Sequence, residues 1–181
     1  RYQPEGWVQT VRAGTAEKPI TITGPSDAVF NAGDPFIINH SHVHLTGMTF
    51  DGLVDPDNPD DPDSYSWGLL EINGALHDRV KNGDHRPDSV SEDNYLRDIV
   101  VKPHAVGNCT RDFIKVNWSK NVEIGEFRII GPAGVDHLKG DRVGHNSEII
   151  YLGNPPDREW APDLTSDVYI HHIDNSSGYP H

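Results

Sequence analysis

The chain repeats a short apolar segment four times, and each copy closes on a residue that favours turns. The four copies are Phe36-Ile37-Ile38-Asn39, Leu69-Leu70-Glu71-Ile72-Asn73, Phe113-Ile114-Lys115-Val116-Asn117 and Ile149-Ile150-Tyr151-Leu152-Gly153. Within each copy, apolar residues alternate with polar or variable ones, as a β-strand requires when one face is buried. A recurring unit of short strands with a fixed turn residue is typical of a solenoid, in which each unit packs on the next.

A second apolar segment follows each copy, with its main residues at relative positions 0, 2, 5 and 7. The expected sets are Val43, Leu45, Met48, Phe50; Asn94, Leu96, Ile99, Val101; Val122, Ile124, Phe127, Ile129; and Val168, Ile170, Ile173, Asn175. The shortest interval between them is 28 residues, from Leu96 to Ile124. The pattern predicts that like strands stack in parallel, one per coil, in about four to five coils. The longer intervals indicate insertions at 51–68, 74–93, 130–147 and 154–167.

The residue that closes each first segment has a predicted structural role. A sharp bend between two strands needs a residue that tolerates positive φ, and Asn is well suited, as is Gly153 in the fourth copy. Stacked coil on coil, Asn39, Asn73 and Asn117 are expected to hydrogen-bond through their side chains along the axis. The sequence therefore predicts an internal asparagine ladder.

Composition limits the class of protein. No stretch of ten or more residues shows a helical apolar period, so we expect an all-β fold. The chain carries 28 acidic and 15 basic residues, a net charge of -13, which argues against nucleic acid as a partner. The apolar runs are shorter than the roughly 18 residues that a membrane span needs. The single Cys109 excludes an intrachain disulfide.

The strand pattern and the asparagine ladder, over residues 7 to 175, resemble the right-handed parallel β-helices of the pectate-lyase-like (pectin lyase-like) group. The opening segments 11–15 and 18–22 look like the first coil of its secreted members. The resemblance implies one β-helix domain over 1–181, either on its own or as part of a longer chain. The Arg-x-Pro-x-x-Arg signature of pectate lyases is absent, so no catalytic residue is assigned by motif.

Two outward columns are the candidate binding surfaces. In the first segments, Glu71, Lys115 and Tyr151 occupy one column, with Ile37 at the equivalent earlier position. In the second segments, the expected column holds His44, Tyr95, Glu123 and Tyr169. Aromatic rings beside charges suit sugars, whose apolar faces stack and whose hydroxyls accept and donate hydrogen bonds. Polar and aromatic residues are also common on any outward strand face.

A polyuronate lyase must remove the proton on the carbon next to a carboxylate. Lys115 is the predicted base, and Arg128 is the predicted clamp for the acid group. Glu71, Glu123 and Glu126 are candidate ligands for a calcium ion that bridges to substrate. The structural alternative for Lys115 is a surface ion pair with Glu71.

Two further groups have the composition of metal sites. The acidic stretch 55–63, with Asp55 and Asp57, suits a hard cation such as calcium, or it is a solvated loop. His40, His42 and His44 alternate along one strand, and would chelate zinc or copper if His171-His172 lay nearby.

Together these features favour a secreted, carbohydrate-active β-helix, lyase-like if enzymatic, at an extracellular or cell-surface location. The triplets at 108–110, 117–119 and 175–177 are N-glycosylation acceptors, which fit a glycoprotein. The predicted partner is a polysaccharide or other glycan. The alternative is a non-catalytic cell-surface, adhesin or filament-forming protein, because the open ends of a β-helix are strand edges that pair end to end with another copy.

Overall fold

The computed structural model describes residues 2, 4, 6–74, 93, 95–134, 148–153, 164–176 and 178. Regular structure in this part is almost entirely β-strand, and its named helix is the short 3₁₀ turn η1 (Pro62–Ser64). The prediction of an all-β chain is confirmed. Within the described ranges, no helix has the length and apolar character needed to cross a bilayer.

The first apolar segments form one five-stranded sheet. Its strands, in spatial order, are β1 (Val8–Gln9), β4 (Phe36–Ile38), β7 (Leu70–Asn73), β10 (Ile114–Asn117) and β12 (Ile150–Leu152). Each pairing is parallel, and Ile38, Ile72, Val116 and Leu152 lie in one register row. The predicted recurrence of the first segment is therefore confirmed residue by residue.

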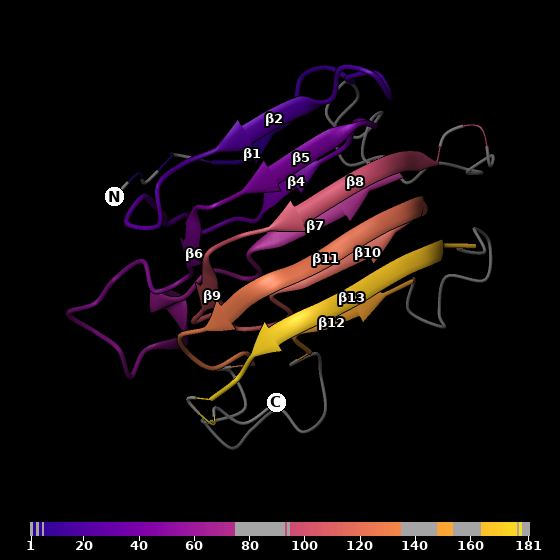
Figure 1. Ribbon diagram of the computed structural model, residues 1–181. Helices are drawn as coiled ribbons and strands as arrows, with labels where there is room; N and C mark the ends of the chain where they lie inside the picture. Colours follow the sequence, from indigo (N-terminus) through magenta and orange to yellow (C-terminus); the bar gives the residue numbers. More distant parts are fainter. Residues whose placement is uncertain are drawn as a thin grey trace.

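The second apolar segments belong to a larger sheet. Its spatial order is β2 (Ile20–Thr23), β5 (Val43–Thr46), β8 (Leu96–Lys102), β11 (Ser119–Ile129), β9 (Ala105–Gly107), β6 (Thr49–Asp51) and β3 (Val29–Phe30), and β13 (Ser166–Asp174) also pairs with β11. These pairings are parallel as well. Figure 1 shows the strands stacked from β1 and β2 at one end to β12 and β13 at the other. The chain alternates between the two sheets as it advances along the stack.

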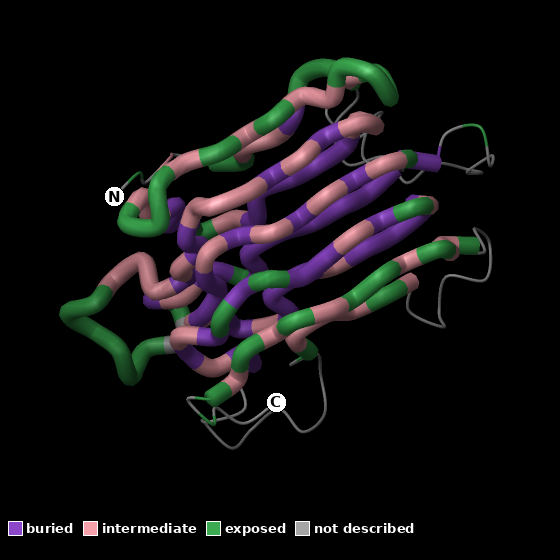
Figure 2. The backbone as a smooth tube through the Cα atoms, in the orientation of Figure 1, coloured by how far each residue is buried: buried purple, intermediate pink, exposed green. Residues whose placement is uncertain are grey.

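Alternation along each strand places the core between the sheets. In β5, Val43 and Leu45 are fully buried, while His44 between them is partly exposed. The same alternation recurs in β10, where Ile114 and Val116 flank Lys115. Figure 2 shows buried residues running through the middle strands of the stack. Burial of each such side chain stabilises the fold by about 1.5–3 kcal/mol.

The register of the second repeat differs from the prediction. Val43 pairs with Ile99 rather than with Asn94, and Leu45 pairs with Val101. Val101 in turn pairs with Ile124, an interval of 23 residues that suits a single coil. The prediction of the register failed because the 0, 2, 5, 7 pattern was placed five residues too early. It started at Asn94, whereas the observed pairing starts at Ile99. By contrast, the expected pairing of the third and fourth second segments, Val122 with Val168 and Phe127 with Ile173, is confirmed.

Positive φ occurs at residues other than the predicted asparagines. Asn39, Asn73 and Asn117 do not have positive φ, although Gly153 does at 90°. Trp118, which directly follows Asn117 and lies between β10 and β11, is left-handed with φ 44°. Further left-handed residues occupy aligned positions beside the second segments: His42 (φ 56°) before β5, Asp98 (φ 58°) in β8, Asn121 (φ 54°) in β11 and Asp167 (φ 55°) in β13. Short polar side chains tolerate this conformation best, because they hydrogen-bond locally. His42 Nδ1 lies 3.0 Å from Asp98 Oδ2, and Asn121 Nδ2 donates to Asp98 Oδ1, so these left-handed positions are linked along the stack.

The three asparagines are buried and form polar links of their own. Asn117 lies opposite Asn73 in the pairing of β10 with β7. Its Nδ2 donates to the carbonyl of Gly153 at 2.5 Å, and Asn39 Nδ2 donates to Gln9 Oε1 at 3.2 Å, both along the stack. Asn73 Nδ2 instead donates to Glu71 Oε1 in its own strand at 2.7 Å.

Candidate functional site

The outward column of the five-stranded sheet runs across four strands. Ile37, Glu71, Lys115 and Tyr151 are consecutive register partners, as the spacing predicts. Ile37 is fully buried and Glu71 is 9% exposed, whereas Lys115 and Tyr151 are partly exposed. The column therefore becomes accessible only from Lys115 onward, which is a shorter surface than the sequence suggested.

A small open hollow lies beside Lys115. It has a volume of about 30 Å³, and its lining residues are Pro35, Trp67, Gly68, Leu70, Glu71, Arg111, Asp112 and Lys115. That is room for about two water molecules or one small polar group of a larger ligand. Gly68 aligns with Asp112, because Leu70 pairs with Ile114 two residues further on. A Cβ at position 68 would lie 3.3 Å from the backbone carbonyl of Asp112, so the two segments approach closely here.

Two cations meet aromatic rings at the hollow and beside it. The guanidinium carbon of Arg111 lies 4.3 Å from the ring centre of Trp67, which is half exposed. Lys115 Nζ lies 5.8 Å from the ring centre of Tyr151. Such contacts hold a cation while leaving it able to bind an anion. In a chain of net charge -13, this pairing of cations and rings marks a surface suited to a carboxylate.

Asp112 places a carboxyl group in the wall of the hollow. It is 7% exposed, and its Oδ1 accepts a hydrogen bond from the backbone N–H of Glu148 at 3.3 Å. Burial, and next the hydrogen bond and charge of the Glu148 carboxyl, raise the pKa of Asp112 to about 7, while Lys115 and the Glu148 N–H act in the opposite direction. A carboxyl group with this pKa can donate or accept a proton near neutral pH.

Lys115 does not form the ion pair that was its structural alternative. Glu71 faces it across β7 and β10, but no ion pair joins these two residues. The Glu71 Oε1 atom accepts from Asn73 instead. Arg128, the predicted clamp, is exposed on β11 of the other sheet, so the structure does not bring it to Lys115.

The second outward column has a different composition from the predicted one. His44, Val100, Glu123 and Tyr169 are register partners, so Val100 takes the place expected for Tyr95. Tyr95 is only 4% exposed, and its hydroxyl accepts a hydrogen bond from the N–H of Leu164 at 2.8 Å. Tyr169 is 62% exposed and stacks on His171 with ring centres 4.7 Å apart.

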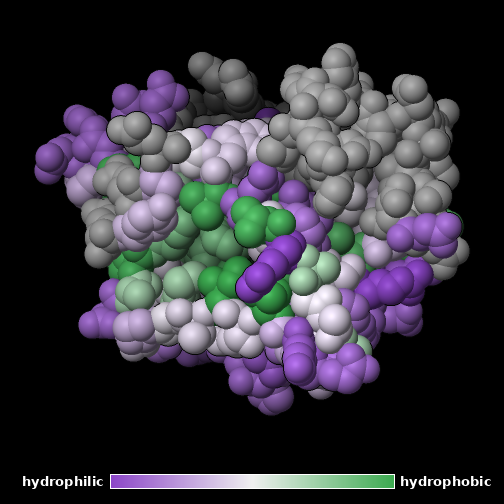
Figure 3. Space-filling view, turned by 90° about the horizontal axis from the view of Figure 1, so that it is seen from above, coloured by the Kyte–Doolittle hydropathy of each residue, from purple (hydrophilic) through white to green (hydrophobic). Residues whose placement is uncertain are grey.

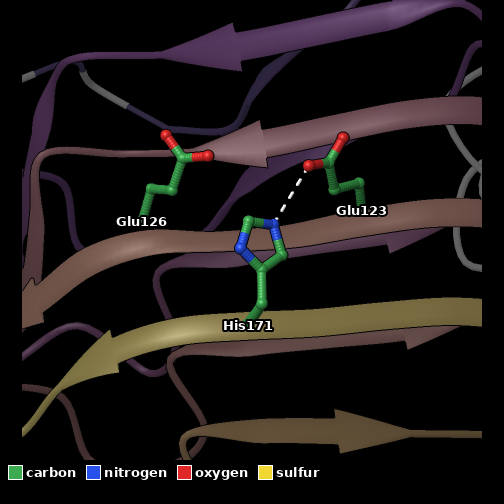
Figure 4. A group of neighbouring side chains, drawn as sticks. All are labelled: Glu123, Glu126 and His171. Atoms are coloured by element: carbon green, nitrogen blue, oxygen red, sulfur yellow. Dashed lines mark hydrogen bonds and ion pairs between the residues drawn. The ribbon is translucent and has the colours of Figure 1, made fainter.

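A charged cluster lies next to Tyr169. Figure 4 shows Glu123, Glu126 and His171 pointing toward one another. One possible metal-ligand atom from each residue, a carboxylate oxygen or a ring nitrogen, lies within 4.8 Å of the other two. His171 Nε2 is 3.0 Å from Glu123 Oε1. Lys102 Nζ lies 2.7 Å from Glu123 Oε1 and 2.8 Å from Glu126 Oε1. Lys102 first, with His171 as a further contributor, lowers the pKa of Glu123.

These residues do not fit a calcium ion in the observed arrangement. The Lys102 ammonium already lies against both carboxylates, and a second cation would have to displace it. In the acidic loop, both carboxylate oxygens of Asp55 accept local hydrogen bonds, from the Asp57 N–H at 3.1 Å and from Asn58 Nδ2 at 2.6 Å. Those contacts are the ones expected of a solvated turn.

The histidines predicted to share a metal are apart. His40 Nδ1 contacts Asn39 Oδ1 at 2.9 Å, and His42 contacts Asp98. His44 lies on β5, and two strands, β8 and β11, separate it from His171 and His172 on β13. The Nδ1 atoms of His171 and His172 are 2.7 Å apart, so these two rings contact each other instead.

Sequence reasoning missed Trp67, Arg111, Asp112 and Glu148. A signal was available, because each lies two or three residues before the paired core of a first segment. If the register of the strands is extended to the residues that precede them, Trp67 aligns with Arg111, and Gly68 aligns with Asp112 and Glu148. The prediction stopped at the strands themselves.

Comparison with known protein families, curated proteins and solved structures finds no match for the chain. Any assignment of function therefore depends on the geometry of the hollow and of the column beside it.

Proposed function

We propose that this chain is an extracellular or cell-surface carbohydrate-active protein that acts as a lyase on polyuronates. The scaffold proposed is a right-handed parallel β-helix of the pectate-lyase-like type. The support for the scaffold is the alternation of the chain between two parallel sheets, with the first segments in one register row. Such a stack presents an extended strip to a linear polymer.

The observation that carries the proposed activity is the position of Lys115. It lies in register between Glu71 and Tyr151, at the rim of a hollow that also contains Arg111 and Asp112. A sugar ring stacking on Tyr151 or Trp67 would present its carboxylate to the Arg111 guanidinium, which binds carboxylates in a forked geometry. Neutralising that carboxylate makes the adjacent C5–H proton easier to remove.

In the proposed reaction, Lys115 first releases its own proton to water, and its amine then takes the C5 proton. The electrons of the C5–H bond form a C4=C5 double bond, and the C4–O bond to the neighbouring sugar breaks. The leaving oxygen then needs a proton. We assign the carboxylate contact to Arg111 rather than to Arg128, because Arg128 lies on the other sheet.

The test is incubation with polygalacturonate, alginate and chondroitin, followed by ultraviolet absorbance of the unsaturated uronate product. We expect signal from the wild type on one of these polymers and a loss of at least about 100-fold in Lys115→Ala, the scale of a removed general base. Arg128→Ala is the matched control and should keep its rate. Absence of product on every polyuronate would exclude the lyase function.

Calcium remains a prediction of the sequence that the geometry does not support. Its expected ligands were Glu71, Glu123, Glu126, Asp55 and Asp57, and no step of the proposed reaction depends on it. Activity that disappears with a chelator and returns with calcium would show that an ion takes part.

A second candidate is a non-catalytic protein that associates end to end. It is favoured by apolar surface at both ends of the stack: Leu152, Leu164, Tyr169 and Ile170 are 41–62% exposed near β12 and β13, and Trp7 is 53% exposed next to β1. Figure 3, which looks onto the β1 and β2 end, shows apolar side chains gathered there. Concentration-dependent oligomers in light scattering would support this candidate, and a monomer at all concentrations would exclude it.

A further inference from the structure

The hollow beside Lys115 is lined by the carboxyl group of Asp112, which the proposed elimination leaves unused. Asp112 precedes β10, and Glu148 precedes β12 at the aligned position, because Ile114 pairs with Ile150. The Glu148 N–H donates to Asp112 Oδ1 at 3.3 Å, which fixes the Asp112 carboxyl against the wall. Asp112 lines the hollow together with Lys115, whereas Glu148 is exposed and is not one of the lining residues.

We infer that Asp112 is the catalytic acid of the site, the group that gives its proton to the departing sugar oxygen, with Glu148 as the residue that positions it. This inference rests on the proposed lyase function. It assigns the acid and the base to different residues, Asp112 and Lys115, which share one hollow.

The geometry favours this division of roles. Two carboxyl groups in contact cannot both ionise without repulsion, so the more buried one retains a proton. Asp112 is the buried member, and the raised pKa of its carboxyl agrees with that role. The hollow that Asp112 lines, next to Lys115, gives a substrate oxygen a place near this carboxyl.

The proton and electron balance closes with these two residues. Lys115 gains the C5 proton and becomes an ammonium ion, while Asp112 loses its proton to the C4 oxygen and becomes a carboxylate. The substrate yields one unsaturated and one saturated sugar end, and no oxidant or reductant is needed. The new Lys115 ammonium and Asp112 carboxylate attract each other, and proton exchange with water restores both.

The test compares two substrates that differ in the leaving group at C4. One is the polyuronate, whose leaving alkoxide needs a proton, and the other is a uronate with a nitrophenol at C4, which leaves unprotonated. We expect Asp112→Asn to lose at least about 100-fold on the polyuronate and less than about threefold on the nitrophenyl substrate. Lys115→Ala should lose activity on both, and Asp27→Asn, an exposed turn residue, should lose it on neither.

The outcomes separate this inference from the proposed function. If the wild type turns over neither substrate, the lyase function is wrong and the inference fails with it. If the wild type is active but Asp112→Asn loses both substrates equally, or neither, only the assignment of the acid is wrong. Glu148→Gln provides a second readout in a variant that keeps the Asp112 carboxyl. The limb of the pH–rate profile that reports Asp112 should move to lower pH, because the Glu148 carboxyl raises the pKa of Asp112, and an unmoved profile would contradict the positioning role.

Discussion

His171 of β13 packs directly on the backbone of Gly125 in β11. A Cβ at position 125 would overlap the carbonyl oxygen of His171 and would lie 3.0 Å from its Nε2. Gly125 and His171 are register partners, so the close approach occurs in the middle of the pairing between the two strands. The absence of a side chain at position 125 allows His171 to reach Glu123.

We expect Gly125→Ala to destabilise the protein because the new methyl group must push β13 away from β11. The free energy of unfolding should fall by about 1–3 kcal/mol, as for other overpacked sites. Urea denaturation measures the change. Gly33→Ala is the control, because its Cβ would meet nothing within 4 Å, and its effect should stay within about 0.5 kcal/mol. Equal stabilities for both variants would mean that β13 does not lie as described.

The buried Asn117 should contribute to stability through its link to Gly153, which follows the neighbouring strand β12. Its Nδ2 donates to the Gly153 carbonyl, and the side chain is fully buried. Replacing it by alanine leaves that carbonyl without this donor, at a cost of about 1–3 kcal/mol. The same substitution at Asn58, which bonds to Asp55 in an exposed loop, should cost less than about 1 kcal/mol. Thermal unfolding of the two variants compares them directly, and a harmless Asn117→Ala would argue against the asparagine link.

Stability should fall as pH rises through the range in which Asp112 loses its proton. The folded protein raises the pKa of Asp112 from 3.8 to about 7, chiefly through burial, so it holds a proton that the unfolded chain has released. The resulting stabilisation is complete below pH 4 and is lost as pH increases to 7, a change of about 2–4 kcal/mol. Asp112→Asn carries no titrating group there.

The measurement is the free energy of unfolding of wild type and Asp112→Asn at several pH values between 4 and 7. The difference between the two proteins should vary with pH, because the wild type alone gains stability as pH decreases. Asp27→Asn, an exposed carboxyl variant, should follow the wild type. Parallel curves for wild type and Asp112→Asn would show that this carboxyl has an ordinary pKa.

The sequence predicted the parts of the fold that depend on simple alternation. Ile38, Ile72 and Val116 align because each first segment is a single strand with a buried face, and a register shift of one would expose them. The register of the second segments was harder to predict, because apolar residues both before and after Asp98 fit the same spacing. The left-handed backbone of Asp98 distinguishes the two possible registers of this segment. In the sequence, a single polar residue before Ile99 was too weak a signal to choose between them.

The candidate site was predicted only where it lies on strands. Lys115 and Tyr151 follow from alternation, whereas Trp67, Arg111 and Asp112 precede the strands, where no period applies. The burial of Glu71 and Tyr95 could not be predicted from the sequence either, because the burial of an outward residue depends on which segments cover it. The hollow is formed in part by the segments that precede β7 and β10. Their alignment is visible only in the three-dimensional structure.

The most direct test of the account is whether an acidic sugar binds at Trp67 and Lys115. Titration with a saturated oligogalacturonate, followed through the indole N–H signals of selectively ¹⁵N-labelled tryptophan, reports on each ring separately. We expect the signal of Trp67 to shift saturably, that of Trp118, which is only 2% exposed, to stay in place, and the Trp67 shift to vanish in Lys115→Ala. A Trp67 signal that never moves, or one that moves equally in Lys115→Ala, would contradict the assignment of this hollow as the binding site.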